Sequence, residues 1–197
     1  MNTLPNPPFL ATMYEAYIRA GFTLVPIERG KGPTTVGWNE KVNCVTRIDQ
    51  LDYTKGYGLA HAYSSPITCS LDIDSWAESL TELATYGIDL NQLVHQPDSV
   101  MIDSGNPGHA KFIFTLPSGM SLPSKKITRA GVTIYELRCA TVSGKTVQDV
   151  LPSAALHPKT GSPYRWAGNG HFSKLPAIPF GLLLLWQSLL ADDAERT

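Results

Sequence analysis

The sequence has few cysteines and few charged residues. Its 197 residues include three cysteines, Cys44, Cys69 and Cys139, which lie far apart and form no Cys-x-x-Cys pair. This spacing supports neither a zinc knuckle nor a disulfide framework, and a reducing, cytoplasmic setting fits it best. Charged residues make up 17% of the chain, which is too few for a disordered polyelectrolyte.

The chain also lacks a long apolar run. Residues 1–9 are polar and proline-rich and have no basic start, unlike a signal peptide. The longest apolar run, at residues 182–186, is far shorter than the ~20 residues that a membrane span needs. We therefore expect no membrane partner. A chain of 197 residues with 43% hydrophobic composition is long enough to bury a core as a single domain.

Positive charge is missing from one stretch and concentrated in the next. Residues 71–103 contain seven acids and no Lys or Arg, whereas residues 104–174 contain nine bases and two acids. The net charge of −1 can therefore conceal a basic face that attracts phosphates. The alternative is that these charges are scattered over a solvated surface.

Hydrophobic periodicity and turn residues predict a mixed chain of helices and strands. Helices are expected at residues 9–20, 46–53, 75–86 and 179–191, and strands at 22–27, 56–61, 67–73, 99–103, 110–116, 132–138 and 146–151. Residues 28–38 and 117–130 are expected to be loops. Because helices and strands do not alternate strictly, the pattern favours an α+β fold over a doubly wound one.

Two acids stand close together at the end of one expected strand. Strand alternation places Asp72 and Asp74 on one face, with Leu71 and Ile73 on the other. Neighbouring carboxylates repel each other unless a cation lies between them, and hard oxygen ligands suit Mg²⁺ or Mn²⁺. The alternative is a strand end at which Asp74 caps the next helix.

A glycine turn follows at residues 104–109, between two expected strands. Such a turn exposes backbone N–H groups that can bind an anion. His109 and Lys111 then share one strand face, where they suit a triphosphate, and Ser104 opens the turn. An ordinary hairpin with a surface histidine is the alternative.

A third group lies on the strand at 132–138. Glu136 and Arg138 share a face, while Tyr135 and Leu137 pack behind it. Glu136 could serve as a third metal carboxylate, and Arg138 as a phosphate or carboxylate partner. The alternative is a surface ion pair, which is common and contributes little.

These three groups, in this order, resemble the archaeo-eukaryotic primase superfamily. More narrowly, they resemble the bifunctional primase-polymerase domains of phage, plasmid and integrated-element replication proteins. The resemblance covers nearly the whole chain through further segments at 20–26, 30–33, 37–38, 56–58, 150–153, 157–161 and 164–166. Two departures are visible: Glu136 stands where many relatives have Asp, and one proline instead of two precedes Ser153.

The resemblance implies a fold and roles for individual residues. It implies an RRM-like antiparallel sheet with flanking helices (66–178), a smaller N-terminal α/β part (1–65), and a C-terminal helix and tail (179–197). Asp72, Asp74 and Glu136 would hold Mg²⁺ or Mn²⁺ for two-metal catalysis. The residues expected to bind the nucleotide are Ser104, His109, Lys111, Arg138 and, in a Lys-x-Pro loop, Lys31.

The expected function is template-directed nucleotidyl transfer that makes or extends primers on single-stranded DNA. The partners would be NTPs or dNTPs, a single-stranded template and a replicative helicase, during replication of a mobile element. Lys125, Lys126 and Arg129, in the loop 117–130, are expected to contact the nucleic-acid backbone. Two alternatives stay open: a catalytically weak nucleic-acid-binding module with the same fold, and a metal-dependent nuclease.

Overall fold

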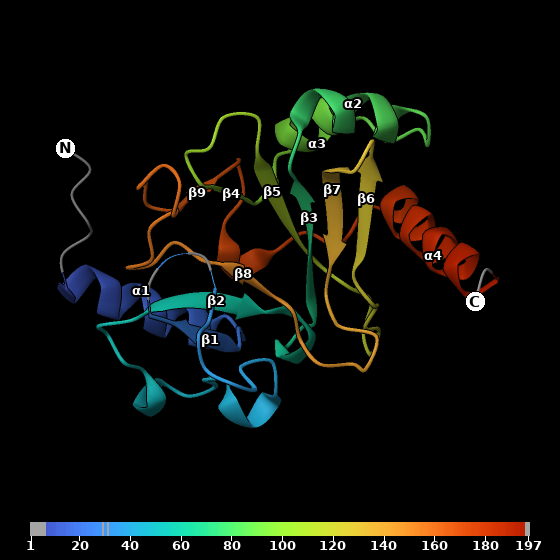
Figure 1. Ribbon diagram of the computed structural model, residues 1–197. Helices are drawn as coiled ribbons and strands as arrows, with labels where there is room; N and C mark the ends of the chain where they lie inside the picture. The colour runs from blue at the N-terminus through green and yellow to red at the C-terminus, as the bar shows by residue number, and fades with distance from the viewer. Residues whose placement is uncertain (1–6, 29, 31, 196–197) are drawn as a thin grey trace.

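The computed structural model describes residues 7–28, 30 and 32–195, which form two antiparallel sheets and four α-helices (Figure 1). This confirms the α+β fold class that the mixed pattern predicted. No helix among the described residues is both long and apolar enough to span a membrane.

The larger sheet has six strands in the order β6-β7-β3-β5-β4-β9. Their bounds are β3 Thr68–Ile73, β4 Met101–Asp103, β5 Ala110–Thr115, β6 Lys125–Arg129, β7 Val132–Arg138 and β9 Arg165–Ala167. Strand β3 lies at the centre and pairs antiparallel with both β5 and β7. Because its side chains alternate, β3 presents Cys69, Leu71 and Ile73 to one face and the polar residues Thr68, Ser70 and Asp72 to the other.

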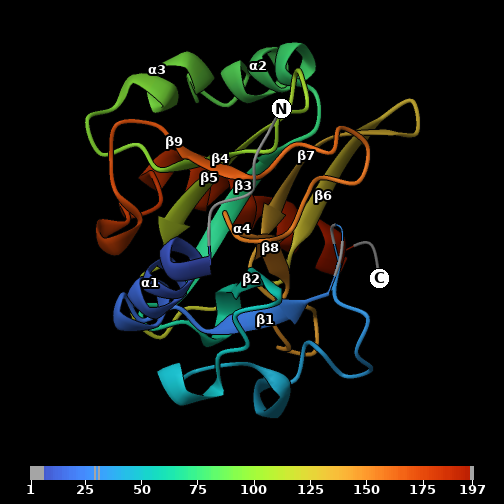
Figure 2. The same ribbon diagram turned by 90° about the vertical axis from the view of Figure 1, so that its left-hand side faces the viewer.

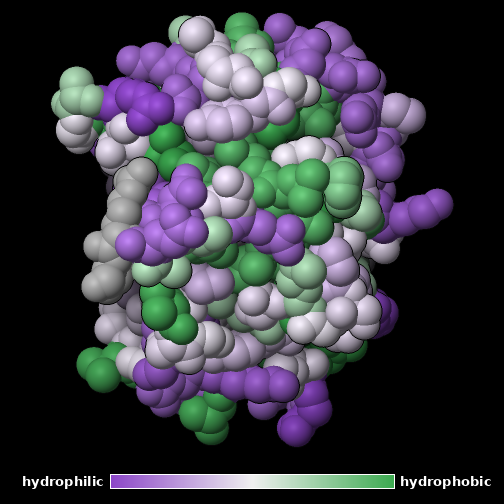
Figure 3. Space-filling view, turned by 90° about the vertical axis from the view of Figure 1, so that its right-hand side faces the viewer, coloured by the Kyte–Doolittle hydropathy of each residue, from purple (hydrophilic) through white to green (hydrophobic). Residues whose placement is uncertain are grey.

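Three helices cover the apolar face of this sheet. They are α2 Trp76–Ala84, α3 Leu90–His95 and α4 Phe180–Glu195. Leu71 and Leu137 from the sheet pack in one core with Leu83 of α2 and Trp186 of α4, all fully buried. On the outer surface of α4, Phe180 and Leu184 stay exposed, on a face where apolar and polar side chains are mixed (Figure 3).

The smaller sheet has three strands in the order β1-β2-β8 and lies with helix α1 on the other side of the large sheet (Figures 1 and 2). The bounds are α1 Pro7–Arg19, β1 Leu24–Ile27, β2 Gly56–Ala60 and β8 Gln148–Val150. Strand β8 can approach β2 closely because Gly58 has no side chain: a Cβ there would lie 2.0 Å from the amide oxygen of Gln148.

A second core joins the two sheets. It includes Tyr17 of α1, Leu59 of β2 and Val150 of β8, together with Ile102 and Ile113 from the large sheet. One face of the small sheet therefore shares its core with the large sheet, while Val25 and Ala60 pack with Cys44 in a small separate cluster. The small sheet also contains a strand, β8, from outside residues 1–65, which were expected to form the N-terminal part.

Two expectations about local structure were wrong. The helix expected at 46–53 is a single 3-10 turn, Ile48–Gln50. None of its residues is buried, so no tertiary packing stabilises a longer helix there. The loop expected at 117–130 contains strand β6, whose only buried residue is Ile127. One apolar residue among four polar ones gives too weak an alternation to predict a strand.

Candidate active site

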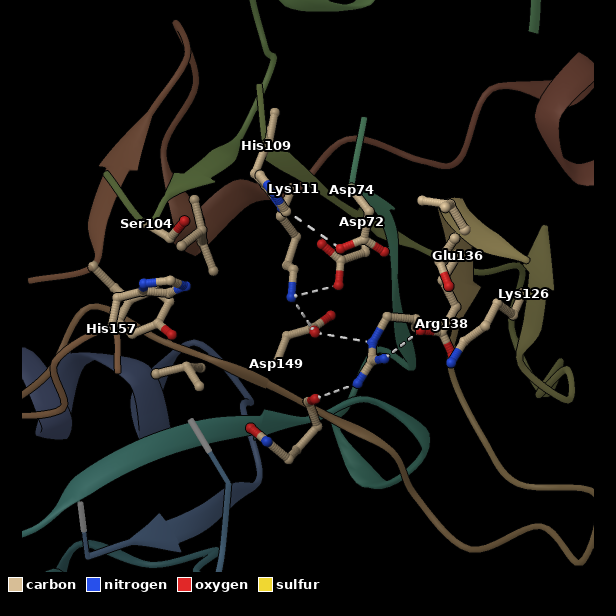
Figure 4. A pocket seen from close by; sticks show the side chains of 17 residues that line it. Asp72, Asp74, Ser104, His109, Lys111, Lys126, Glu136, Arg138, Asp149 and His157 are labelled. Atoms are coloured by element: carbon tan, nitrogen blue, oxygen red, sulfur yellow. Dashed lines mark hydrogen bonds and ion pairs between the residues drawn. The ribbon is translucent and has the colours of Figure 1, made fainter. Parts of the chain in front are cut away.

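A cavity of about 640 Å³ opens between the polar face of the large sheet and strand β8 (Figure 4). Its volume lies within the range of ~300–1,000 Å³ that is usual for small-molecule sites. The predicted site residues that line it are Asp72, Asp74, Ser104, His109, Lys111, Lys126, Glu136 and Arg138. Three segments that lie far apart in the chain thus contribute to one site.

Strand pairing explains why these residues meet. Asp72 on β3 lies opposite Lys111 on β5 and opposite Glu136 on β7. Residues directly opposite each other share a face of the sheet, so all three side chains point into the cavity. The neighbouring position, Leu71, points to the helices, which is the alternation that the sequence predicted.

Lys111 lies at the floor of the cavity between two carboxylates. Its ammonium group is 3.1 Å from Asp72 Oδ2 and contacts Asp149 Oδ1. Burial alone would lower the pKa of Lys111, but Asp149 and Asp72 outweigh it, so the pKa is raised. The side chain therefore keeps its positive charge in the folded protein.

Arg138 is held by two hydrogen bonds and by an ion pair with Asp149. Its guanidinium donates to Glu136 Oε2 at 2.7 Å and to the backbone oxygen of Gln148 at 2.8 Å, and its Nε lies 3.0 Å from Asp149 Oδ1. Burial opposes the charge, but Asp149 and Glu136 outweigh it and raise the pKa of Arg138. The alternative of a simple surface ion pair is excluded, because Arg138 also reaches a buried acid.

Asp149 is the residue that sequence reasoning missed. Its side chain is 1% exposed, and it contacts Lys111, Arg138, the hydroxyl of Ser70 and, at 2.8 Å, Nε2 of His61. Burial would raise the pKa of Asp149, but Arg138 and Lys111 hold it well below its usual range. A signal was present: Asp149 and Glu136 are the two acids of the basic stretch 104–174, and both lie on strands.

His61 supports Asp149 from behind as a neutral group. Its ring is fully buried, and burial lowers its pKa despite the neighbouring carboxylate. With Nε2 facing Asp149, Nδ1 lies 2.9 Å from the hydroxyl of Thr68. Lys111 and Arg138 thus share this buried carboxylate, and each is paired with a second carboxylate, Asp72 or Glu136, at the cavity face.

The glycine turn lies at the rim of the cavity, where Ser104 and His109 line it. His109 Nδ1 is 3.5 Å from Asp74 Oδ1, so the turn and the end of β3 face each other. Gly105 has a φ of 67°, and a Cβ there would lie 2.7 Å from the side chain of Ser162. A larger residue at position 105 would therefore push the turn away from the loop that precedes β9.

The basic cluster of β6 is divided between two faces. Lys126 lies opposite Glu136 and lines the cavity, whereas Lys125 is 2.5 Å from Asp193 of α4. Arg129 contacts Glu82 of α2. These contacts correct the picture of a free basic loop. Lys31 lies outside the described residues.

The family model for the bifunctional DNA primase/polymerase N-terminal domain (Prim-Pol) matches residues 14–179, which include every one of these cavity residues. The chain belongs to the Prim-Pol family. No curated protein matches the sequence significantly. Membership connects the chain, in general terms, with DNA priming and polymerisation.

The carboxylate oxygens of this Prim-Pol site are of the chemical type that binds a hard divalent cation. The side chains of Asp72 and Asp74 point toward the same part of the cavity (Figure 4), and carboxylate oxygens are the ligands that Mg²⁺ and Mn²⁺ prefer. Glu136 stays with Arg138, and within the described ranges no three acidic, histidine or cysteine side chains form a metal-binding group. Glu136 would have to leave Arg138 to join the two aspartates.

Proposed function

We propose that this Prim-Pol domain catalyses metal-dependent, template-directed nucleotidyl transfer on single-stranded DNA, making primers, extending them, or both. One observation carries the proposal: carboxylates and partly buried cations line the same face of one sheet and open into one cavity. Phosphoryl transfer needs this combination, because catalysis depends on positioning and on neutralising charge.

In this proposal the cations bind the triphosphate. Lys111 and Arg138 are charged and held in place, so they meet the phosphates with little loss of conformational freedom. His109 and Ser104, which line the cavity at the glycine turn, would bind the outer phosphates. Lys126 lies beside Glu136, where it can contact nucleotide or template phosphates.

The carboxylates would hold the metal ions. Asp72, Asp74 and, once released from Arg138, Glu136 would be the ligands. When bound, such ions lower the pKa of the primer 3′-hydroxyl and neutralise charge on the phosphates. In the reaction the 3′-oxygen bonds to the α-phosphorus, the bond from the α-phosphorus to the bridging oxygen breaks, and pyrophosphate leaves. The hydroxyl proton passes to solvent.

The biological setting rests on family resemblance alone. Related domains act in the replication of mobile elements beside a helicase, and we propose the same setting and partner for this chain. The basic stretch 104–174 is consistent with a polyanionic template.

The test is incorporation of labelled NTPs and dNTPs on single-stranded DNA, with and without a primer, in Mg²⁺ and in Mn²⁺. The variant Asp72→Asn/Asp74→Asn keeps the shape of the site but removes two ligand charges. We expect it to lower incorporation at least about 100-fold. The matched control is Asp192→Asn, which removes an exposed charge from α4 and should leave incorporation unchanged.

The outcomes separate the proposal from its alternatives. Primer-independent products that disappear in the double variant would establish a primase. Binding of single-stranded DNA with no incorporation in either metal would favour the binding module. Metal-dependent shortening of the DNA, with no added nucleotides, would favour the nuclease.

A further inference from the structure

Tyr164 occupies a wall of the cavity that the proposed chemistry does not use. It lies at the end of the loop before β9, is 8% exposed and lines the cavity. Its ring packs edge to face against His157, with 5.9 Å between ring centroids. The ring is therefore fixed in position by its neighbours, and its orientation does not depend on a ligand.

The hydroxyl of Tyr164 has no hydrogen-bond partner among residues 7–28, 30 and 32–195. Two other buried tyrosines have hydrogen-bonded hydroxyls: Tyr17 donates to the backbone oxygen of Pro152 at 2.8 Å, and Tyr14 donates to that of Lys55 at 2.8 Å. A buried hydroxyl without a partner destabilises a fold, so such groups are rare and point to a role. Burial raises the pKa of Tyr164 to about 12, so the hydroxyl stays neutral and can donate.

The wall around Tyr164 differs in character from the sheet face. Ile102 and Val150 line the cavity together with Tyr164 and His157, belong to the same core as Tyr164, and carry no charge. Figure 4 shows His157 and Ser104 on one side of the cavity, Glu136 and Lys126 on the other, and Lys111 and Asp149 between them. A triphosphate placed over Lys111 would thus leave its nucleoside next to the uncharged wall.

We propose that the Tyr164 hydroxyl donates a hydrogen bond to a sugar oxygen of the bound nucleotide and positions the sugar over the sheet. The inference rests on the proposed function, because it takes a nucleoside triphosphate as the ligand. It adds a contact to the nucleoside, whereas Lys111 and Arg138 contact phosphate. Tyr164 is thus a determinant of nucleotide affinity that is independent of the metal ligands.

The test is binding of ATP, dATP and inorganic tripolyphosphate to the whole chain, without DNA, by calorimetry in Mg²⁺. Tyr164→Phe removes only the hydroxyl. We expect the variant to bind ATP, dATP or both about tenfold more weakly, which corresponds to one hydrogen bond, and to bind tripolyphosphate as the wild type does. Its melting temperature should stay the same or rise, whereas Tyr17→Phe, which loses a satisfied hydroxyl, should melt lower.

Three results would overturn the inference. Equal affinities of the wild type and Tyr164→Phe for both nucleotides would show that the hydroxyl makes no contact with them. An equal loss for tripolyphosphate would place the contact on a phosphate and reject the sugar. A lower melting temperature for Tyr164→Phe would show that the hydroxyl has a structural partner. If the wild type binds neither nucleotide nor tripolyphosphate, the proposed function itself fails.

Discussion

Asp149 connects stability with the candidate chemistry at the scale of a single residue. It is one carboxylate shared by Lys111, Arg138, Ser70 and His61. A buried ion pair is a weak source of stability compared with apolar packing, but loss of one partner leaves the other charges buried without compensation. The acid matters to the fold because two partly buried cations lie beside it, and their second partners, Asp72 and Glu136, do not replace its fully buried carboxylate.

We expect Asp149→Asn to lower the free energy of unfolding by about 3–5 kcal/mol. The amide keeps the shape but leaves Lys111 and Arg138 with one negative charge fewer. Urea denaturation measures the change, and Asp192→Asn, on the exposed side of α4, should stay within about 0.5 kcal/mol of the wild type. A change of similar size in both variants would contradict the role given to Asp149.

The stability of Asp149→Asn should also depend on acid pH differently from that of the wild type. The folded pKa of Asp149 is well below its usual range, that is, below the unfolded value of about 3.9. Its contribution is therefore present above about pH 4 and is lost as the pH falls toward the folded pKa. Melting temperatures below pH 4 should fall less steeply in Asp149→Asn than in the wild type.

The sequence predicted the acids and cations of the cavity but not the residue that holds the cations. Asp72, Asp74, His109, Lys111, Glu136 and Arg138 belong to local patterns, each visible within a few residues. Asp149 acts through contacts with Ser70, Lys111 and Arg138, which lie 79, 38 and more than ten positions away in the chain. Nothing local marks such a residue.

At the scale of elements, β6 shows how alternation divides a run of charges. Lys126 shares the cavity face with Glu136, while Lys125 faces α4 and forms an ion pair with Asp193. Although the two lysines are neighbours in sequence, one faces the proposed ligand and the other faces a helix. Strand geometry, not the number of charges, decides which of them can bind phosphate.

We expect Lys126→Ala to weaken binding of single-stranded DNA or nucleotide about threefold to tenfold, and Lys125→Ala to change it less than twofold. The ion pair of Lys125 is partly exposed, so its loss should cost less than about 1 kcal/mol of stability. Fluorescence anisotropy at two salt concentrations measures both variants. Equal losses in binding would show that the strand does not separate the two lysines.

Elements with strong periodicity were predicted closely, whereas two short elements, α3 and β9, were not predicted. The helix expected at 9–20 is α1 Pro7–Arg19, and the strand expected at 132–138 is β7 Val132–Arg138. Helix α3 has six residues and β9 has three, which is too short for a period to show. Both form because neighbouring elements pair with them or cover them, and a sequence window does not contain those partners.

At the scale of the whole molecule, the two sheets depend on each other. The side chains of Ile102 and Ile113 project from the large sheet into the core that also contains residues of the small sheet. Asp149 adds a polar connection from β8 to β5 and β7. The cavity thus lies between the two sheets, beside this polar connection.

We therefore expect the two sheets to unfold as one unit. Native-state hydrogen exchange measures the free energy of opening at each slowly exchanging amide. We expect the values for β1 and β2 to lie within about 1 kcal/mol of those for β3 and β7. If the small sheet opened alone, with a clearly lower opening free energy, the shared core would not couple the two sheets. The same measurement on Asp149→Asn would show how much of the coupling is polar.

The split origin of the small sheet decides where this domain can be recombined with a relative. Two of its strands come from the first 60 residues, and the third, β8, comes from residues 148–150. A chimera with a single crossover near residue 65 would pair foreign β1 and β2 with a native β8, and would require Gly58 of one parent to fit Gln148 of the other. An exchange that keeps the active site intact has to transfer both segments together.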